Sequence, residues 1–426
     1  MRILNSQDPT VKGLLKKQVA NIEEIEARVQ EILKAVRDQG DEAVFAFTRQ
    51  FDRALINTQN FRVTEEEIKE ASTQVEPEVL TAIRQAAENI RQFHEKQKVN
   101  SWMEPDAQGT ILGQLCRPLA RVGIYVPGGT APLPSSVLMN AIPAQVAGVR
   151  EIVMTTPPQA DGRINPYILV AAAEAGVTEI YKVGGAQAVA ALAYGTESVR
   201  KVDKIAGPGN IYVTIAKKLV YGEVDIDMLA GPSEVLVIAD GTANPRYVAA
   251  DLLSQAEHDV LASAILVTPS TALAEAVQVE VERQLAVLSR QDIALTAIRD
   301  YGAIILTTDL AEAVEIANEF APEHLELLVE RPFELLGGIK NAGAIFLGTY
   351  SPEPVGDYWA GPNHVLPTGG TARFYSPLSV DTFIKKSSII AYSETSFRQG
   401  AAAIIKLAMI EGLDAHANSV RVRLDG

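Results

Sequence analysis

The sequence predicts an α/β fold with two Rossmann-like, doubly wound modules, both incomplete, and small extensions at the N- and C-termini. The main observation is that short β-rich runs alternate with helical segments, an order that implies parallel strands covered by helices. The alternation occurs in two series, one from Arg121 to about Tyr221 and another from Glu234 to Leu347. A second observation is that the segment after about Leu378 breaks the alternation. We therefore expect two modules and a small C-terminal addition.

Helix-start signals mark the N-terminal part of the chain. Asn21 with Glu24 has the pattern of a capping box, and so does Thr64 with Glu67. Apolar residues recur at helical spacing over 77–98, which indicates an amphipathic helix. These segments predict helices before the first series of strands.

The two series predict the following elements. The first has strands at 122–126, 151–155 and 179–183 and helices at 136–149, 166–175, 186–194 and 211–221. The second has strands at 234–239, 264–268, 303–307 and 344–347. Asn244 with Pro245 starts a helix after the first strand of the second series, and an Ala-rich helix over 397–411 ends the chain.

Composition and charge exclude several classes of protein. The 426 residues include 38 Lys and Arg against 53 Asp and Glu, a formal net charge of −15. Such a surface repels nucleic-acid phosphates and anionic lipids, so we expect no nucleic-acid partner. We also expect no membrane partner, because no apolar run approaches the roughly 18 residues of a membrane span. Residues 1–13 lack the apolar core of a signal peptide, and we predict a cytoplasmic protein.

A single cysteine limits the possible metal sites. Cys116 alone excludes an intrachain disulfide framework and every zinc site built from several cysteines. Any metal must therefore use histidine, carboxylate or amide ligands. Of the five histidines, His94 lies in the amphipathic helix, where a half-exposed structural residue is the simplest interpretation.

Two segments pair residue types that bind metals or transfer protons. Gln255 and His258, near the end of a predicted helix, share one helical face and could converge on a metal, although polar residues at helix ends show the same spacing. Glu323 and His324 directly follow Pro322, which ends or redirects a helix. They could form a proton relay, or belong to a solvated loop.

Further candidates lie toward the C-terminus. A Gly- and Pro-rich loop at 356–364 holds Asp357 and His364, where a carboxylate could reach a metal. Glu411 and His416 look, on their own, like a surface pair. A plausible zinc shell is formed by Gln255, His258, Asp357 and His416. Because only the aspartate in this set is charged, bound Zn²⁺ would keep a net positive charge and its Lewis acidity.

No Gly-x-Gly-x-x-Gly fingerprint of a dinucleotide site follows a strand. Gly-rich turns occur instead at 128–129, 184–185 and 207–209, each before a helix, where backbone N–H groups could bind a pyrophosphate. Such turns are common in α/β proteins and do not by themselves indicate NAD.

Seven segments, in this order and spacing, resemble the histidinol dehydrogenase family. They are Arg121-Val-Gly-Ile-Tyr-Val-Pro-Gly-Gly, Val183-Gly-Gly-Ala-Gln-Ala, Ala206-Gly-Pro-Gly-Asn, Ala230-Gly-Pro-Ser-Glu, Ser254-Gln-Ala-Glu-His, Ala321-Pro-Glu-His-Leu-Glu and Gly361-Pro-Asn-His. The resemblance covers essentially the whole chain. One departure is Val260, since the family usually has proline after Glu-His-Asp; this alters the loop after a metal ligand but removes no functional group.

The resemblance implies an enzyme that oxidises L-histidinol to L-histidine with NAD and one zinc ion per subunit. It implies NAD contacts from Tyr125, Gln187 and Asn210, in place of the missing glycine fingerprint. It also implies that Glu323 and His324 are the acid–base pair.

The implied zinc ligands are Gln255, His258, Asp357 and His416. The implied substrate contacts are Ser233, His364 and Glu411, together with the zinc ligands and His324. The family forms homodimers in which the C-terminal tail reaches the partner's site, so Glu411 and His416 should act there.

The implied domain division has four parts. Residues 1–24 form an N-terminal extension, 25–105 with 236–377 form the catalytic and zinc module, 106–235 form the NAD-binding module, and 378–426 form the tail. Two hydride transfers through a bound aldehyde would follow. A covalent thiohemiacetal is not favoured, because the only thiol, Cys116, lies outside every candidate cluster.

Three other functions fit parts of this pattern. A related dehydrogenase could oxidise another polar alcohol, such as a sulfonated diol, although His364 and Glu411 favour histidinol. A two-lobed binding protein would need no acid–base pair, and a metal-dependent hydrolase would not use NAD.

Overall fold

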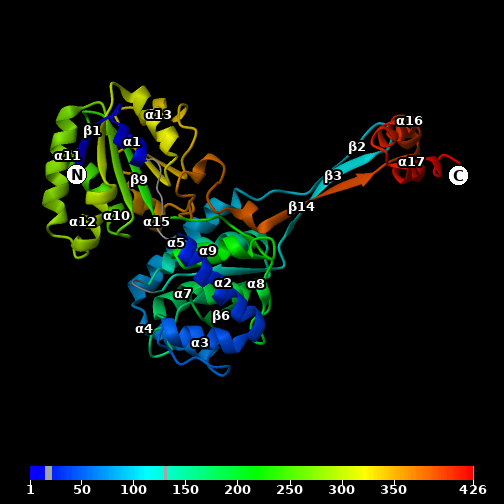
Figure 1. The fold of residues 1–426 in the computed structure, drawn as a ribbon, viewed down its shortest axis with the longest axis horizontal. Helices are drawn as coiled ribbons and strands as arrows, with labels where there is room; N and C mark the ends of the chain where they lie inside the picture. The colour runs from blue at the N-terminus through cyan, green and yellow to red at the C-terminus, as the bar shows by residue number, and fades with distance from the viewer. Residues whose placement is uncertain (15–21, 129–131, 426) are drawn as a thin grey trace. The chain divides into compact units, whose positions relative to one another are not determined.

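The computed structural model describes residues 1–14, 22–128 and 132–425. The chain divides into two units, the first made of Met1–Gln97 and Leu119–Phe383, the second of Lys98–Pro118 and Ile384–Gly426 (Figure 1). The first unit contains two parallel sheets, and the second contains an antiparallel sheet with two helices. The predicted N-cap Asn21 and the predicted turn residue Gly129 lie outside the described residues.

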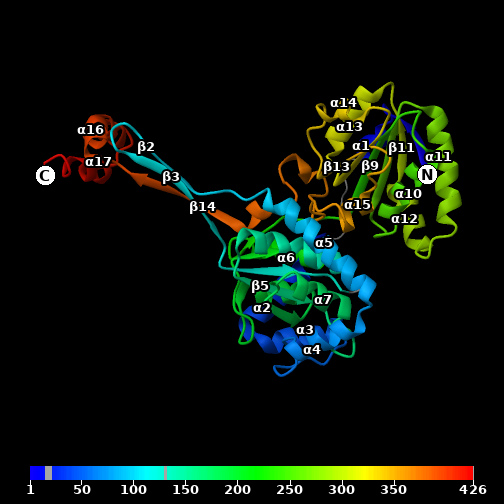
Figure 2. The same cartoon turned by 180° about the vertical axis from the view of Figure 1, so that it is seen from behind.

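The first parallel sheet and its helices come from the middle of the sequence. They are β4 (Arg121–Tyr125), α6 (Pro134–Ala147), β5 (Glu151–Thr156), α7 (Pro166–Glu174), β6 (Glu179–Lys182), α8 (Gly185–Tyr194), β7 (Lys204–Ala206), α9 (Ile211–Val220) and β8 (Asp225–Ile226). The strand order is β6-β5-β4-β7-β8, so the chain leaves β4 in both directions. Helices α8 and α9 therefore cover one face (Figure 1), and α6 and α7 cover the other (Figure 2).

Four N-terminal helices surround this first sheet. They are α2 (Ile22–Gln39), α3 (Asp41–Phe51), α4 (Glu65–Gln74) and α5 (Pro77–Glu95). The capping box predicted at α4 is confirmed, because Glu67 N–H donates to Thr64 Oγ1 at 3.2 Å and Thr64 N–H donates to Glu67 Oε2 at 2.9 Å. Val29 and Leu33 of α2 are buried in the same core as Ala188 of α8 and Val213 of α9. Helix α2 thus shares a core with α8 and α9.

The second parallel sheet has six strands in the order β1-β11-β10-β9-β12-β13. Its elements are β1 (Arg2–Asn5), α1 (Pro9–Leu14), β9 (Glu234–Ala239), α10 (Pro245–Ala256), β10 (Ser263–Thr268), α11 (Thr271–Leu285), α12 (Gln291–Tyr301), β11 (Ala303–Leu306), α13 (Leu310–Phe320), β12 (His324–Leu328), α14 (Pro332–Leu336), β13 (Ala344–Leu347), α15 (Glu353–Tyr358) and η1 (Thr371–Arg373). The short helix η2 (Val380–Phe383) packs instead against α6. The predicted doubly wound α/β class is confirmed in both sheets. The first residues of the chain belong to this sheet, because β1 pairs with β11.

The second unit is antiparallel. It contains β2 (Trp102–Pro105), β3 (Ile111–Pro118), β14 (Ile384–Ala391), α16 (Glu394–Ile410) and α17 (Asp414–Arg421). Strand β3 lies between β2 and β14, with Ile384 opposite Pro118. Cys116 lies in this sheet with its Sγ 3.7 Å from the Asn100 carbonyl oxygen. Across the described parts of both units, no helix combines the length and apolarity needed to cross a membrane.

Candidate active site

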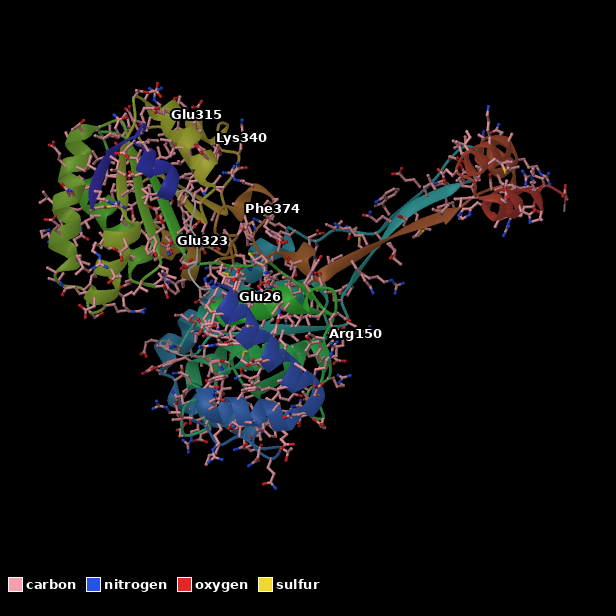
Figure 3. All side chains as sticks on the ribbon, in the orientation of Figure 1. Glu26, Arg150, Glu315, Glu323, Lys340 and Phe374 are labelled. Carbon is pink, nitrogen blue, oxygen red and sulfur yellow. The ribbon has the colours of Figure 1, made fainter. Side chains whose placement is uncertain are left out.

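A cavity of about 640 Å³ in the first unit gathers most of the candidate residues. From the first sheet it is lined by Pro127, which follows β4, and by Gly209 and Asn210, which follow β7. From the second sheet it is lined by Ser233, before β9, and His324, at the start of β12. The cavity therefore meets the carboxyl edge of the first sheet and the amino edge of the second. In Figure 3, Glu323 is labelled at this end of the second sheet.

Gln255 and His258 reach the cavity from the end of α10. Gln255 is fully buried, and neither atom of its side-chain amide has a hydrogen-bond partner in the described part of the chain. His258 lies beyond the last helical residue, Ala256, and its side chain is exposed. A buried amide without a partner is costly, so it indicates a ligand that is not protein.

Three residues at this cavity have ligand atoms within 4.8 Å of one another: His258, Glu353 and Asp357. Glu353 and Asp357 are four residues apart on α15, so both lie on one face of that helix. The nitrogen and oxygen donors, together with the unpartnered amide of Gln255, fit a zinc ion. Sequence reasoning missed Glu353, although its i, i+4 spacing to Asp357 directly after Pro352 could have indicated it.

Glu323 and His324 are both buried, rather than parts of a solvated loop. His324 Nδ1 lies 3.1 Å from the Glu234 carbonyl oxygen, so Nδ1 carries the proton and donates it there. His324 Nε2 has no hydrogen-bond partner in the described residues, and it lies 3.9 Å from Glu353 Oε1. Burial lowers the pKa of His324 to about 4, so the ring is neutral at pH 7 and Nε2 can accept a proton.

The pKa of Glu323 is raised, whereas that of His324 is lowered. Burial raises the pKa of its carboxyl well above the ordinary value, and the charges of Glu234, Glu353 and Asp357 raise it further. One hydrogen bond opposes this, because Glu234 N–H donates to Glu323 Oε2 at 2.9 Å. A carboxylate with a raised pKa is a stronger base when ionised and holds a proton more readily. The pair thus combines a neutral imidazole and a carboxyl suited to proton transfer.

His364 and Ser233 complete the wall of the cavity. His364 Nε2 lies 3.4 Å from Ser136 Oγ, and its Nδ1 lies 3.9 Å from Asp357 Oδ1. Burial lowers the pKa of His364. By contrast, His94 is fully buried on α5, where its Nδ1 lies 2.8 Å from the Ile90 carbonyl oxygen. The prediction that His94 is half-exposed is therefore wrong, although its contact with the Ile90 carbonyl fits the predicted structural role.

The three predicted NAD positions differ in exposure. Asn210 is exposed and lines the cavity, and its side chain accepts hydrogen bonds from the first N–H groups of α9. Tyr125 is buried, and its hydroxyl accepts a hydrogen bond from Gly185 N–H at 3.1 Å. Gln187 is also buried, and both atoms of its side-chain amide lack partners in the described chain. Tyr125 and Gln187 thus lie beside the start of α8 rather than among the residues that line the cavity.

The last two candidates lie in the second unit. Glu411 follows the last residue of α16, and His416 lies on α17; both side chains are exposed. The predicted site residues are therefore divided between the two units, with Gln255, His258 and Asp357 in the first.

Fold and cavity together define a two-module α/β protein with a buried acid–base pair beside a cluster of metal-binding side chains. Comparison with known proteins makes this more specific. The family model described as histidinol dehydrogenase matches residues 15–424. The chain belongs to the histidinol dehydrogenase family, the oxidoreductases of histidine biosynthesis.

Individual relatives of this chain carry the same family name. Histidinol dehydrogenase of Heliobacterium mobile is 62% identical over 425 residues, covering 100% of both chains. That of Bacillus subtilis (strain 168) is 57% identical over 410 residues, covering 96% of each. The crystal structure of histidinol dehydrogenase from Elizabethkingia anophelis matches with a TM-score of 0.95 and 42% identity, over 100% of this chain and 98% of that one.

Proposed function

We propose that this protein oxidises L-histidinol to L-histidine in two successive two-electron steps, with NAD and zinc, through L-histidinaldehyde that stays bound. The observation that carries the proposal is the free Nε2 of a buried, neutral His324 beside Glu323 and a cluster of metal-binding groups. Alcohol oxidation needs a base that removes the hydroxyl proton as hydride leaves carbon, and His324 has the position and protonation state for that role.

The proposed zinc site holds one ion per subunit. Gln255, His258 and Asp357 would supply three ligands, and His416 of a second copy of the chain would supply the fourth. When bound, zinc supplies a positive charge that orients the nitrogen atoms of the substrate and polarises its oxygen. The unpartnered amide of Gln255 and the short separations within the metal-binding cluster support this assignment.

The protein side chains then handle the protons. In the first oxidation, His324 takes the hydroxyl proton from histidinol. His324 then releases that proton to solvent. In the second oxidation, Glu323 removes a proton from the water that adds to the aldehyde, and the neutral His324 takes a proton from the resulting gem-diol. The 3.1 Å bond to the Glu234 carbonyl fixes the ring so that Nε2 faces the cavity in both steps.

The proposed NAD contacts are Tyr125, Gln187 and Asn210. When bound, NAD accepts one hydride in each of the two oxidations. Support comes from Asn210, which lines the cavity at the turn between β7 and α9. Tyr125 and Gln187 surround Gly185, whose φ of +66° a side chain would strain.

Substrate selection is assigned to Ser233 and His364 from the first unit and Glu411 from a second copy. A carboxylate and an imidazole can hydrogen-bond the imidazole ring of histidinol, which a sulfonated diol lacks.

A homodimer with shared sites is also proposed, because Glu411 and His416 are assigned to the active site of a second copy of the chain. Exposed apolar side chains on the second unit support it, among them Trp102, Met103, Leu112, Ile390, Leu407 and Ile410. The proposed location is the cytoplasm, which fits a biosynthetic enzyme with one cysteine.

Removing and restoring the metal tests this proposal. Treatment with a chelator should abolish NADH formation from L-histidinol, and re-addition of zinc should restore it. Folded, zinc-loaded protein that turns over a sulfonated diol but not histidinol would contradict the proposed substrate. Turnover of histidinol that survives complete chelation would contradict the proposed role of zinc.

A further inference from the structure

Two buried carboxyl groups lie behind the metal-binding cluster and have no role in the chemistry above. Glu326 is fully buried on β12, two residues after His324 and so on the same face of the strand. Asp251 is buried on α10, one helical turn before Gln255. The two carboxyl groups interact directly, and each shifts the pKa of the other.

Glu326 also holds the start of α15. Its Oε1 accepts a hydrogen bond from the backbone N–H of Glu353 at 3.0 Å, and the residue before this helix, Pro352, provides no side-chain cap. The Ser254 hydroxyl lies 3.4 Å from Glu353 Oε2, a second link between α10 and α15. The carboxyl of Glu326 therefore contacts α10 through Asp251 and α15 through its first N–H group.

Burying this pair of carboxyl groups does not stabilise the fold. Burial raises the pKa of both carboxyl groups, and no Lys or Arg is among the groups that shift either pKa. Two carboxyl groups in contact cannot both ionise without strong repulsion, so the pair holds a proton between them. Apolar side chains of similar size would cost less to bury.

We propose that Glu326 is a positioning residue for the metal site: by bridging Asp251 on α10 and the first N–H group of α15, it fixes Asp357 relative to Gln255 and His258. The inference rests on the proposed zinc site. Asp357 lies one turn after Glu353 on α15, and Gln255 lies one turn after Asp251 on α10. A shift at the bridge would therefore change the separation of the ligands one turn away.

The experiment compares Glu326→Leu with Glu326→Gln in the full chain, by competition for zinc with a chromophoric chelator. Glutamine keeps an oxygen acceptor for the Glu353 N–H and an amide donor for Asp251, whereas leucine keeps neither. We expect Glu326→Leu to weaken zinc binding by roughly 10- to 100-fold. Glu326→Gln should stay within about threefold of the unsubstituted protein, because both contacts are retained.

Asp41→Asn is the matched control. Asp41 is a buried carboxylate on α3 that accepts a hydrogen bond from the Ser198 hydroxyl, far in sequence and fold from the metal-binding cluster. Its substitution should leave zinc affinity unchanged. Unaltered affinity in folded Glu326→Leu, or an equal loss in Glu326→Gln, would overturn the proposal. If Glu326→Leu does not fold, Glu326→Met, which also lacks an oxygen acceptor for the Glu353 N–H, is compared with Glu326→Gln under the same expectations.

Amide hydrogen exchange in metal-free protein separates this inference from the zinc assignment. Glu326→Leu should speed exchange across 353–358, and Glu326→Gln should not. If the unsubstituted protein fails to bind zinc, the proposed function is contradicted, while the exchange pattern still tests the positioning role. Equal exchange in all variants would overturn that role.

Discussion

The Nδ1 atom of His324 lies 3.1 Å from the backbone carbonyl oxygen of Glu234. The first residue of β12 is thereby linked to the first residue of the neighbouring strand β9, so two adjacent strands fix the ring. This contact sets the tautomer of His324: a carbonyl oxygen can only accept a hydrogen bond, so Nδ1 carries the proton. Nε2 is left as the basic atom in the cavity.

Substitution of His324 by asparagine should therefore remove the base without removing a proposed metal ligand. We expect kcat with L-histidinol to fall by roughly 10²- to 10⁴-fold, the usual contribution of a positioned acid–base group. Metal content, measured on the same preparation, is the control and should match that of the unsubstituted protein. Activity within a few-fold of the original would rule out His324 as the base.

Gln255 should show a trade-off between stability and metal binding. In metal-free protein, Gln255→Leu should raise the free energy of unfolding by about 1–3 kcal/mol, because it replaces a buried amide that lacks partners. The same change should abolish tight zinc binding. Urea unfolding and zinc titration measure the two effects. A less stable leucine variant would show that the amide has a protein partner, and unchanged zinc affinity would remove Gln255 from the ligand set.

Asp52, whose charge acts on the proposed NAD contact Tyr125, gives a pH-dependent prediction. Burial raises the pKa of Asp52 from 3.8 to about 6, and its Oδ2 has no hydrogen-bond partner in the described residues. The folded state favours the neutral carboxyl. The contribution of Asp52 to the free energy of unfolding is therefore fully present below pH 3.8 and is lost as the pH rises through 6.

Asp52→Asn should therefore raise the free energy of unfolding at pH 7 by about 2 kcal/mol. The gain should shrink toward zero as the pH approaches 4. Urea unfolding at several pH values measures it. A gain that does not depend on pH would show that charge burial is not its cause.

Sharing of sites between subunits can be tested with two inactive variants. A His416→Asn chain and a Glu323→Gln chain, unfolded and refolded together, should form hybrids in which one of the two sites is intact. Activity should return to about a quarter of the original, since half of the dimers are hybrids. Each variant refolded alone is the control. No recovery in verified hybrids would place Glu323 and His416 in sites formed within one chain.

The sequence predicted several of the parallel strands, because buried runs such as 234–239 and 264–268 consist of β-favouring residues between turns. The antiparallel sheet of the second unit was not predicted. It pairs β3 with β14, more than 260 residues apart in the chain, and no local pattern encodes such a pairing.

The candidate site was predicted unevenly for similar reasons. Gln255, His258, Glu323 and His324 stood out by local composition, and the structure brings all four to one cavity. Burial of Glu323 and His324 could not be predicted, since it depends on β12 lying between β9 and β13. The roles of Glu326 and Asp251 were missed because each looks ordinary in its own segment.

Under the proposed function, one protein carries out both oxidations. The most direct test measures NADH formed per L-histidinol consumed by zinc-loaded protein with excess NAD. We predict two NADH for each histidinol, L-histidine as product and no free aldehyde. One NADH per histidinol with released aldehyde would contradict the account.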